Sequence, residues 1–174
     1  MPAPTLIMNA VLANIWLNIQ AQLATVPDLK FIDLDTGQLE YKDSQERPAV
    51  LLPCALFDVL DIDFESLSAG VQEGEAILQV RLGVNPLTQA TNYFTNTQKA
   101  NALYFFNLEQ LVHQALHGWC NSQYFTPLRR VKLRTEGRND KLRVRVMQFK
   151  FTYLDNTATP VTTTIARPNL ALTV

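Results

Sequence analysis

Apolar side chains recur at intervals of four between residues 5 and 24, which predicts an amphipathic helix. Its apolar stripe consists of Ile7, Val11, Ile15, Ile19 and Leu23. Thr5 is placed to cap the start of this helix, and Pro27 prevents its continuation. The polar face carries Asn and Gln rather than charged residues, so we expect it to tolerate partial burial, for example against another subunit.

Three stretches that follow favour extended structure. Residues 30 to 42 predict a hairpin, because Gly37 can supply the positive φ that a short hairpin loop requires. Residues 49 to 65 predict a second extended stretch, in which Pro53 indicates an edge position or a bulge. Residues 76 to 84 alternate most regularly and lie between turn-forming residues, Gly70 to Gly74 before them and Asn85-Pro86 after them, so we expect them to form the central strand.

The second half of the chain predicts a loop, a helix and two strands. Residues 85 to 101 are rich in Asn, Thr and Gln without any period, which indicates a long loop. Residues 107 to 119 predict a helix that begins with a capping box of Asn107 and Gln110 and ends near Gly118.

Residues 128 to 135 and 141 to 155 predict a pair of antiparallel strands around a polar turn. The apolar positions of the second strand change phase at Val146 and Met147. A one-residue change of phase would turn half of the strand's apolar side chains to water, so we predict a β-bulge at this point.

The fold class that follows is α+β, with a mainly antiparallel sheet of about five to six strands and two main helices packed on it. The chain has 174 residues, which is the size of one domain, and we assign residues 1 to 155 to it. Residues 156 to 174 are Thr-rich and nearly uncharged, and we expect them to form an extended C-terminal tail that lies along a surface.

Composition excludes several classes of protein. No apolar run reaches the roughly 20 residues that span a bilayer, and the N-terminus lacks the positive charge of a secretory signal, so we expect no membrane partner. Cys54 and Cys120 are too few for a disulfide framework and wrongly spaced for a zinc site. We expect both to be buried free thiols in a reducing compartment such as a cytoplasm.

Charge is strongly segregated although the net charge is only −1. Nine of the fifteen basic side chains lie between residues 129 and 150, where Glu136 and Asp140 are the only acids. Residues 1 to 128 carry five basic and thirteen acidic side chains. A chain with an acidic part and a basic part indicates charged partners rather than a particular fold.

Candidate catalytic and metal-binding residues are few. His113 and His117 stand four apart on a predicted helix, a spacing that can hold a metal, but the Glu of a metalloprotease motif is absent. Asp61, Asp63 and Glu65 could share a hard cation, although a solvated acidic strand face is the commoner explanation of such a pattern. There is neither a phosphate-binding glycine loop nor a Gly-x-Ser-x-Gly elbow, and we predict no enzyme, no metal and no cofactor.

Two charged strand faces are the strongest candidates for binding sites. The predicted basic edge consists of Arg130, Lys132, Arg134, Arg143 and Arg145, which alternate with apolar residues and would form one row of cations. The predicted acidic edge consists of Asp58, Asp61, Asp63 and Glu65. The basic row predicts a negative partner, which is either nucleic acid or the acidic edge of an identical neighbour; head-to-tail contacts of the second kind can close into a ring.

The succession of elements resembles that of the tail terminator, or tail-completion, proteins of long-tailed bacteriophages. The resemblance covers roughly residues 6 to 155 and rests on the order of an amphipathic helix, a hairpin, a Pro-Ala-Val-Leu-Leu strand, the strand Glu75–Val84, the helix Asn107–Gly118 and two final strands. It implies a small α+β subunit, six of which form a ring that caps the tail tube and joins it to the head connector. The expected partners are therefore further copies of the chain, a tail tube protein and a head connector protein, in a virion tail assembled in the bacterial cytoplasm. The family has no catalytic residues, and nucleic acid would be met only as DNA passing through the ring.

Overall fold

A computed structural model describes residues 10–40, 50–68, 70–85, 91–140 and 142–159. The elements in chain order are α1 (Val11–Leu23), β1 (Phe31–Leu34), β2 (Cys54–Ser68), β3 (Val71–Val84), α2 (Asn96–Ala102), α3 (Tyr104–Leu116), β4 (Arg129–Thr135) and β5 (Arg143–Asp155). The strands form one five-stranded sheet in the order β1-β2-β3-β5-β4. β1 runs parallel to β2 and all other neighbours are antiparallel, which confirms the α+β fold class with a mostly antiparallel sheet.

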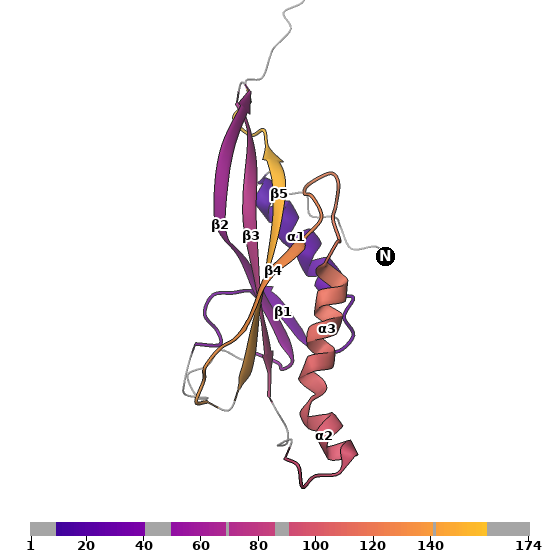
Figure 1. The fold of residues 1–174 in the computed structure, drawn as a ribbon. Coiled ribbons are helices and arrows are strands. Elements are labelled where there is room, and N and C mark those ends of the chain that lie inside the picture. Colours follow the sequence, from indigo (N-terminus) through magenta and orange to yellow (C-terminus); the bar gives the residue numbers. More distant parts are fainter. Residues whose placement is uncertain (1–9, 41–49, 69, 86–90, 141, 160–174) are drawn as a thin grey trace, which may run out of the picture.

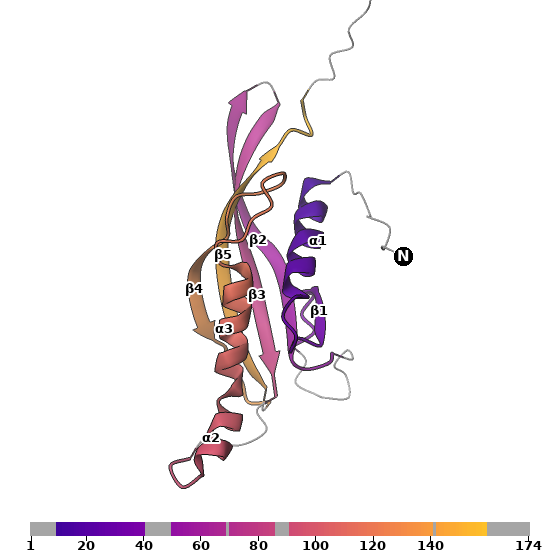
Figure 2. The ribbon, with the colours of Figure 1, turned by 90° about the vertical axis from the view of Figure 1, so that its right-hand side faces the viewer.

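α1 and α3 lie side by side on one face of this sheet, here called the helix face (Figures 1 and 2). Ile15, Ile19 and Leu23 of α1 are fully buried there, as the four-residue period predicts. They pack with α3 and with the inward side chains of β2, β3 and β5 in the main core. β3 is the middle strand of the sheet, which confirms the predicted central strand.

The amide face of α1 is used inside the molecule. Gln22 Nε2 donates to the carbonyl oxygen of Ala115 at 2.8 Å, and Gln20 Nε2 donates to that of Ile32 at 3.2 Å. Asn121 Nδ2 donates to Asn18 Oδ1 at 2.8 Å. The amides thus satisfy backbone and side-chain groups of the same subunit, which explains why this partly buried face carries no charges.

A second, smaller core lies on the other face of the sheet, here called the back face. It consists of Leu39, Cys54, Leu56 and Val144, with Phe31, Val50, Leu52 and Leu142 packed against them. This core explains the change of apolar phase in β5, because Val144 is buried on the back face while Met147 and Phe149 are buried on the helix face. The predicted bulge at Val146-Met147 is therefore wrong: β5 pairs with β3 in unbroken register, and the second core covers its back face near Val144.

Several local predictions differ from the structure. Residues 30 to 42 form no hairpin as far as the structure describes them, because Phe31–Leu34 pairs in parallel with β2 and residues 38 to 40 form a turn; Gly37 does adopt a φ of 84°. The predicted loop 85 to 101 contains the start of α2, whose capping box is formed by Thr95 and Gln98. Asn107 lies inside α3 and caps nothing.

Other boundaries also move. α1 begins at Val11 in the structure, and the predicted cap at Thr5 lies outside the described residues. β3 begins at Val71, so Gly74 is a strand residue rather than a turn residue. A Cβ on Gly74 would lie 2.8 Å from Cε1 of Tyr153 and 3.1 Å from Cγ2 of Ile62. The glycine therefore makes room for the buried ring of Tyr153 on the neighbouring strand. Residues 160–174 of the predicted tail lie outside the described part.

Candidate assembly surfaces

The four acids of the predicted acidic edge lie together on the back face of β2. Their partners across the sheet are Gln79 for Asp58, Ile77 for Asp61, Glu75 for Asp63 and Glu73 for Glu65. A register shift between Val59 and Asp61 brings Asp58 onto the same face as the other three, because positions 58 and 61 would otherwise point to opposite faces. Asp61, Asp63 and Glu65 are exposed.

Sequence reasoning missed two members of this surface. Glu73 and Glu75 of β3 face the same side, opposite Glu65 and Asp63. Their side chains were assigned to no site because the strand pairing that places them is not visible in the sequence. We call the six residues Asp58, Asp61, Asp63, Glu65, Glu73 and Glu75 the acidic surface.

The predicted row of five cations does not lie on one face. A register shift between Arg130 and Lys132 divides β4, so that Arg130 pairs opposite Phe149 on the helix face, whereas Lys132 pairs opposite Gln148 on the back face. Arg134, opposite Val146, is also on the back face. The alternation Arg130, Lys132, Arg134 seen in the sequence is thus broken by a bulge at Val131.

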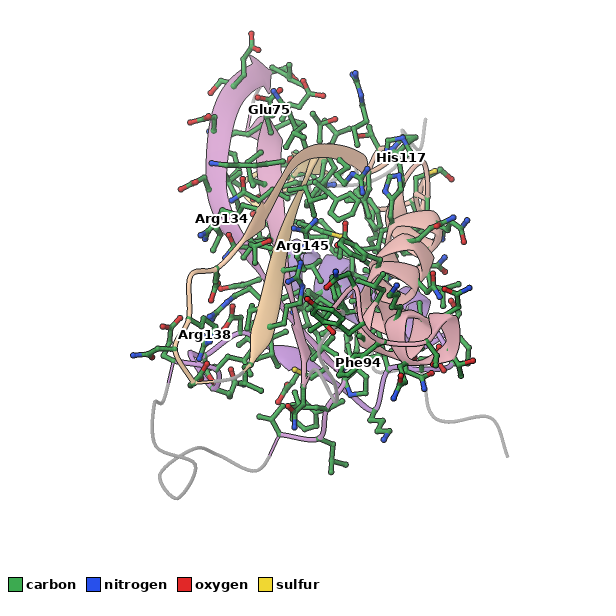
Figure 3. All side chains as sticks on the ribbon, turned by 60° about the horizontal axis from the view of Figure 1, so that its bottom comes forward. Glu75, Phe94, His117, Arg134, Arg138 and Arg145 are labelled. Atoms are coloured by element: carbon green, nitrogen blue, oxygen red, sulfur yellow. The ribbon has the colours of Figure 1, made fainter. Side chains whose placement is uncertain are left out.

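Arg143 and Arg145 lie on the helix face, beneath α3. Arg145 Nε donates to Glu109 Oε2 at 2.7 Å, and its Nη2 donates to Oε1 at 3.1 Å. The guanidinium carbon of Arg143 stands 3.7 Å from the ring centroid of Phe105. Burial lowers the pKa of Arg143, and the charge of Arg145 adds to this effect. Both arginines are therefore components of the sheet-to-helix packing; Figure 3 shows Arg145 between strand and helix, with Arg134 on the far side of β4.

The back face nevertheless carries a basic surface. It consists of Arg129, Lys132 and Arg134 of β4 and Lys150 of β5, which faces Arg129 across the strand pair. Lys150 Nζ lies 2.5 Å from Glu75 Oε1 where the basic and acidic surfaces meet. Arg129, Lys132 and Arg134 form no ion pair with any described residue. One face of the sheet thus has an acidic border at β2 and a basic border at β4.

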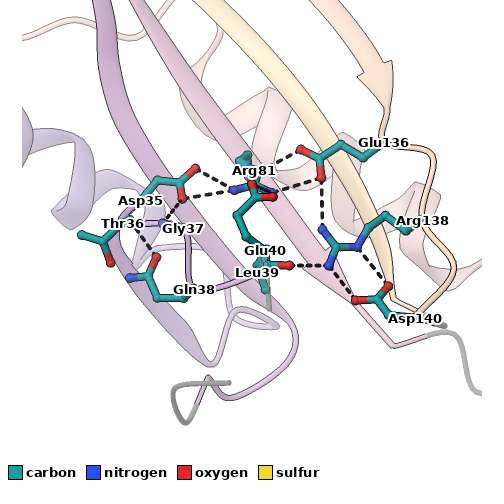
Figure 4. A network of polar contacts seen from close by, with 10 residues as sticks. All are labelled: Asp35, Thr36, Gly37, Gln38, Leu39, Glu40, Arg81, Glu136, Arg138 and Asp140. Carbon is teal, nitrogen blue, oxygen red and sulfur yellow. Dashed lines mark hydrogen bonds and ion pairs between the residues drawn. The ribbon is translucent and has the colours of Figure 1, made fainter. Parts of the chain in front are cut away.

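A buried ionic network lies beside the second core, and sequence reasoning did not find it (Figure 4). Arg81 of β3 is 5% exposed and donates to Asp35 and to both carboxylate oxygens of Glu136, at 2.9 to 3.2 Å. Glu40 Oε1 lies 2.9 Å from Arg81 Nη2. Burial alone would lower the pKa of Arg81, but the hydrogen bonds to Glu136 and the charges of Asp35, Glu136 and Glu40 raise it above its ordinary value.

Arg138 extends the network across the turn before β5. It donates to Asp140, to Glu136 and to the carbonyl oxygen of Leu39. The hydrogen bond to Asp140 raises the pKa of Arg138 despite its burial. Arg81 and Arg138 thereby connect the 35–40 segment and the 136–140 turn to the sheet. The only sign of this ionic network in the sequence is one Arg at an alternating position of the central strand.

The two histidines at the end of α3, His113 and His117, lie next to each other. Their ring centroids lie 4.8 Å apart, and His117 Nδ1 accepts a hydrogen bond from the backbone N–H of Arg130 at 3.2 Å. This hydrogen bond connects the end of α3 to the start of β4. The pKa of His113 is lowered, first by burial and then by the charges of Arg130 and His117. The charge of Glu109 opposes this shift without cancelling it. In the described ranges no group of three or more His, Cys, Asp or Glu side chains is arranged to hold a metal ion.

Cys54 and Cys120 form no disulfide with each other. Cys54 is buried in the second core, as predicted, whereas Cys120 is exposed, which corrects the prediction for that residue. None of the helices in the described part is long and apolar enough to cross a membrane.

Comparison with known proteins gives distant likenesses among solved structures. No family model matches the chain, and no curated protein sequence matches it. A solved chain from the virion of a native gene transfer agent particle is similar in fold, with 13% sequence identity and a TM-score of 0.41 over 84% of this chain and 92% of that one. A likeness of this size carries no functional argument.

Proposed function

We propose that the chain is a structural subunit of a phage or phage-like tail, which assembles head to tail into a homomeric ring and performs no catalysis. The observation that carries this proposal is the charge separation on the back face, with an acidic surface at one border of the sheet and a basic surface at the other. A subunit with opposite charges on opposite borders attracts its own copies in a head-to-tail manner, and such contacts close into a ring when the rotation allows.

The place of this ring in the tail follows from the resemblance in the order of elements. Of the elements that carry this resemblance, a helix, a long central strand, a second amphipathic helix and two final strands occur in the structure, whereas within the described residues the hairpin does not and residues 50–52 form no strand. On this basis the ring would have six subunits, end the tail tube and join it to a head connector protein. Assembly would take place in the bacterial cytoplasm, and the mature location would be the virion tail.

The first test is the mass of the purified full chain in solution. Light scattering coupled to size exclusion should give a multiple of 19.7 kDa, with six copies expected, and negative-stain micrographs should show rings. A strictly monomeric protein at the highest soluble concentration contradicts the proposal. Co-purification with the tail tube and connector proteins of the same gene cluster tests the position in the tail.

A second candidate function is nucleic-acid binding by the basic strand pair 129–150. The specific observation in its favour is that Arg129, Lys132 and Arg134 are exposed and form no ion pair in the part of the chain that the structure describes. Phosphate contacts would make the affinity fall steeply with salt. Fluorescence anisotropy with duplex and single-stranded oligonucleotides at low ionic strength tests this, and absence of binding there eliminates it.

A further inference from the structure

Two strands present an edge that pairs with no other described strand. β4 is the last strand of the sheet on one side. On the other side β1 pairs only with Cys54–Phe57 of β2, so among the described strands residues 58–68 of β2 have a neighbour, β3, on one side alone. Free edges offer backbone N–H and C=O groups to a further strand. These two edges lie at opposite borders of the same sheet, as a head-to-tail contact requires.

The signs of the charges on the two edges select one kind of contact. Charged residues on edge strands commonly prevent pairing between molecules. For that purpose both edges need the same sign, because every edge then repels every edge of another copy. Here β2 carries Asp61, Asp63 and Glu65, whereas β4 carries cations. Contacts of β2 with β2 or of β4 with β4 are repulsive, and contacts of β2 with β4 are attractive.

The helix face of the same two strands is also complementary. Phe64 of β2 is 49% exposed, and its ring lies edge-on to that of Tyr153 on the helix face. Leu133 of β4 is 37% exposed and pairs opposite Met147, also on the helix face. When the two edges join, apolar side chains meet on the helix face while opposite charges meet on the back face.

Strand directions allow this contact to repeat. β2, β3, β5 and β4 alternate in direction, so β4 runs opposite to β2. Rotation about the ring axis keeps strand directions along that axis, and β2 of the next copy therefore runs opposite to β4 of the first. The seven residues of β4 also fit within the free part of β2. The pattern of an antiparallel sheet thus continues across the contact.

We propose that β4 of one copy pairs in an antiparallel manner with residues 58–68 of β2 in the next copy, so that the ring has a continuous sheet as its wall. This inference rests on the proposed function and names the surfaces that would form its subunit contacts. The acidic and basic surfaces of the back face then meet at each contact.

Cysteine cross-linking of the full chain tests the inference. In a Cys120→Ser background, Lys132→Cys is combined in turn with Asp61→Cys, Asp63→Cys and Glu65→Cys, three positions that sample successive registers on the back face. Mild oxidation should give a ladder of covalent oligomers up to the ring size for at least one pair. The control is Lys132→Cys with Gln114→Cys, which is exposed on α3 and should give no ladder.

The outcomes separate the two proposals. A ladder from an edge pair, together with rings in micrographs, supports the inference. Rings that form in all variants while none of the three edge pairs gives a ladder overturn the inference and leave the proposed function standing. Monomers in the unsubstituted protein overturn both.

Charge reversal provides a second, independent readout. Lys132→Glu with Arg134→Glu should raise the concentration at which the ring dissociates by at least about tenfold. Adding Asp61→Lys and Asp63→Lys should restore assembly. Lys30→Glu with Lys99→Glu changes the net charge equally and serves as the control. Reversal without effect on ring dissociation contradicts the inference, as does failure of the compensating pair to restore the ring.

Discussion

Arg145 on β5 donates two hydrogen bonds to Glu109 on α3, and this ion pair lies between the sheet and the helix. Their side chains are 16% and 11% exposed. Thr135 Oγ1 accepts a third hydrogen bond from Arg145 at 2.5 Å, which links β4 to the same pair. A residue that the sequence pattern assigns to a polar surface therefore connects three elements of the fold.

Glu109→Ala should lower the free energy of unfolding by about 3 kcal/mol, because it leaves the Arg145 guanidinium largely buried without its partner. The loss should be smaller when Arg145→Met is added, since no unpaired charge then remains. Urea unfolding followed by circular dichroism measures both. The matched control is Glu75→Gln, whose partner Lys150 is 43% exposed, and which should change the free energy by less than about 1 kcal/mol.

Arg81→Met should destabilise the protein by about 3 kcal/mol, because Asp35 is little exposed and would lose this counter-charge, while Glu136 would keep only Arg138 among the described cations. Adding Asp35→Asn and Glu136→Gln should recover part of this loss. Arg134→Met on the back face is the control and should be nearly neutral. An Arg81→Met variant with an unchanged urea midpoint would show that water replaces the guanidinium.

Gly74→Ala should cost about 1 to 3 kcal/mol, because the added methyl group meets the buried ring of Tyr153. Tyr153→Leu in the same chain should reduce the penalty of the alanine, although it costs packing by itself. A double-mutant cycle of thermal unfolding measures this coupling. Additive effects of the two substitutions would mean that the ring is not the obstacle.

The lowered pKa of His113 predicts that stability falls on acidification. A group with a depressed pKa in the folded state contributes stability that is present above its ordinary pKa of 6.5 and is lost as the pH falls through the folded value. We expect His113→Gln to show a smaller decrease in unfolding midpoint between pH 7.5 and pH 5 than the unsubstituted chain. Equal decreases in both proteins would assign the pH dependence to other groups.

Local periodicity was enough to predict α1, β3 and α3. The buried stripes of α1 and α3 and the alternation of β3 each report the helix face, which the main core covers. β5 misled the prediction because its two halves bury opposite faces, with Val144 in the second core and Phe149 in the main core. A strand read alone cannot reveal that its sheet has a core on each side.

The charged residues show the same limit of a prediction made from one strand at a time. The β2 part of the acidic surface was predicted because Asp61, Asp63 and Glu65 alternate without interruption, whereas its β3 part was not. The basic row failed because a bulge at Val131 and the packing of α3 over Arg145 depend on contacts between distant segments. β1 was missed as a parallel strand for the same reason, since its partner begins twenty residues after its own last residue.

The uneven covering of the sheet has a consequence for local opening. Near the start of β2 the sheet is covered on both faces, by the main core and by the second core with its ionic network. Toward the β2–β3 turn at Gly70, Phe64 and Leu67 are exposed and the two strands extend beyond the helices (Figure 1). Amide hydrogens at this end should exchange with solvent faster than those of Leu56 or Leu82, because opening there exposes little additional apolar surface. Exchange measured by mass spectrometry should therefore show a gradient along β2 and β3, with the slowest amides beside the Arg81 network.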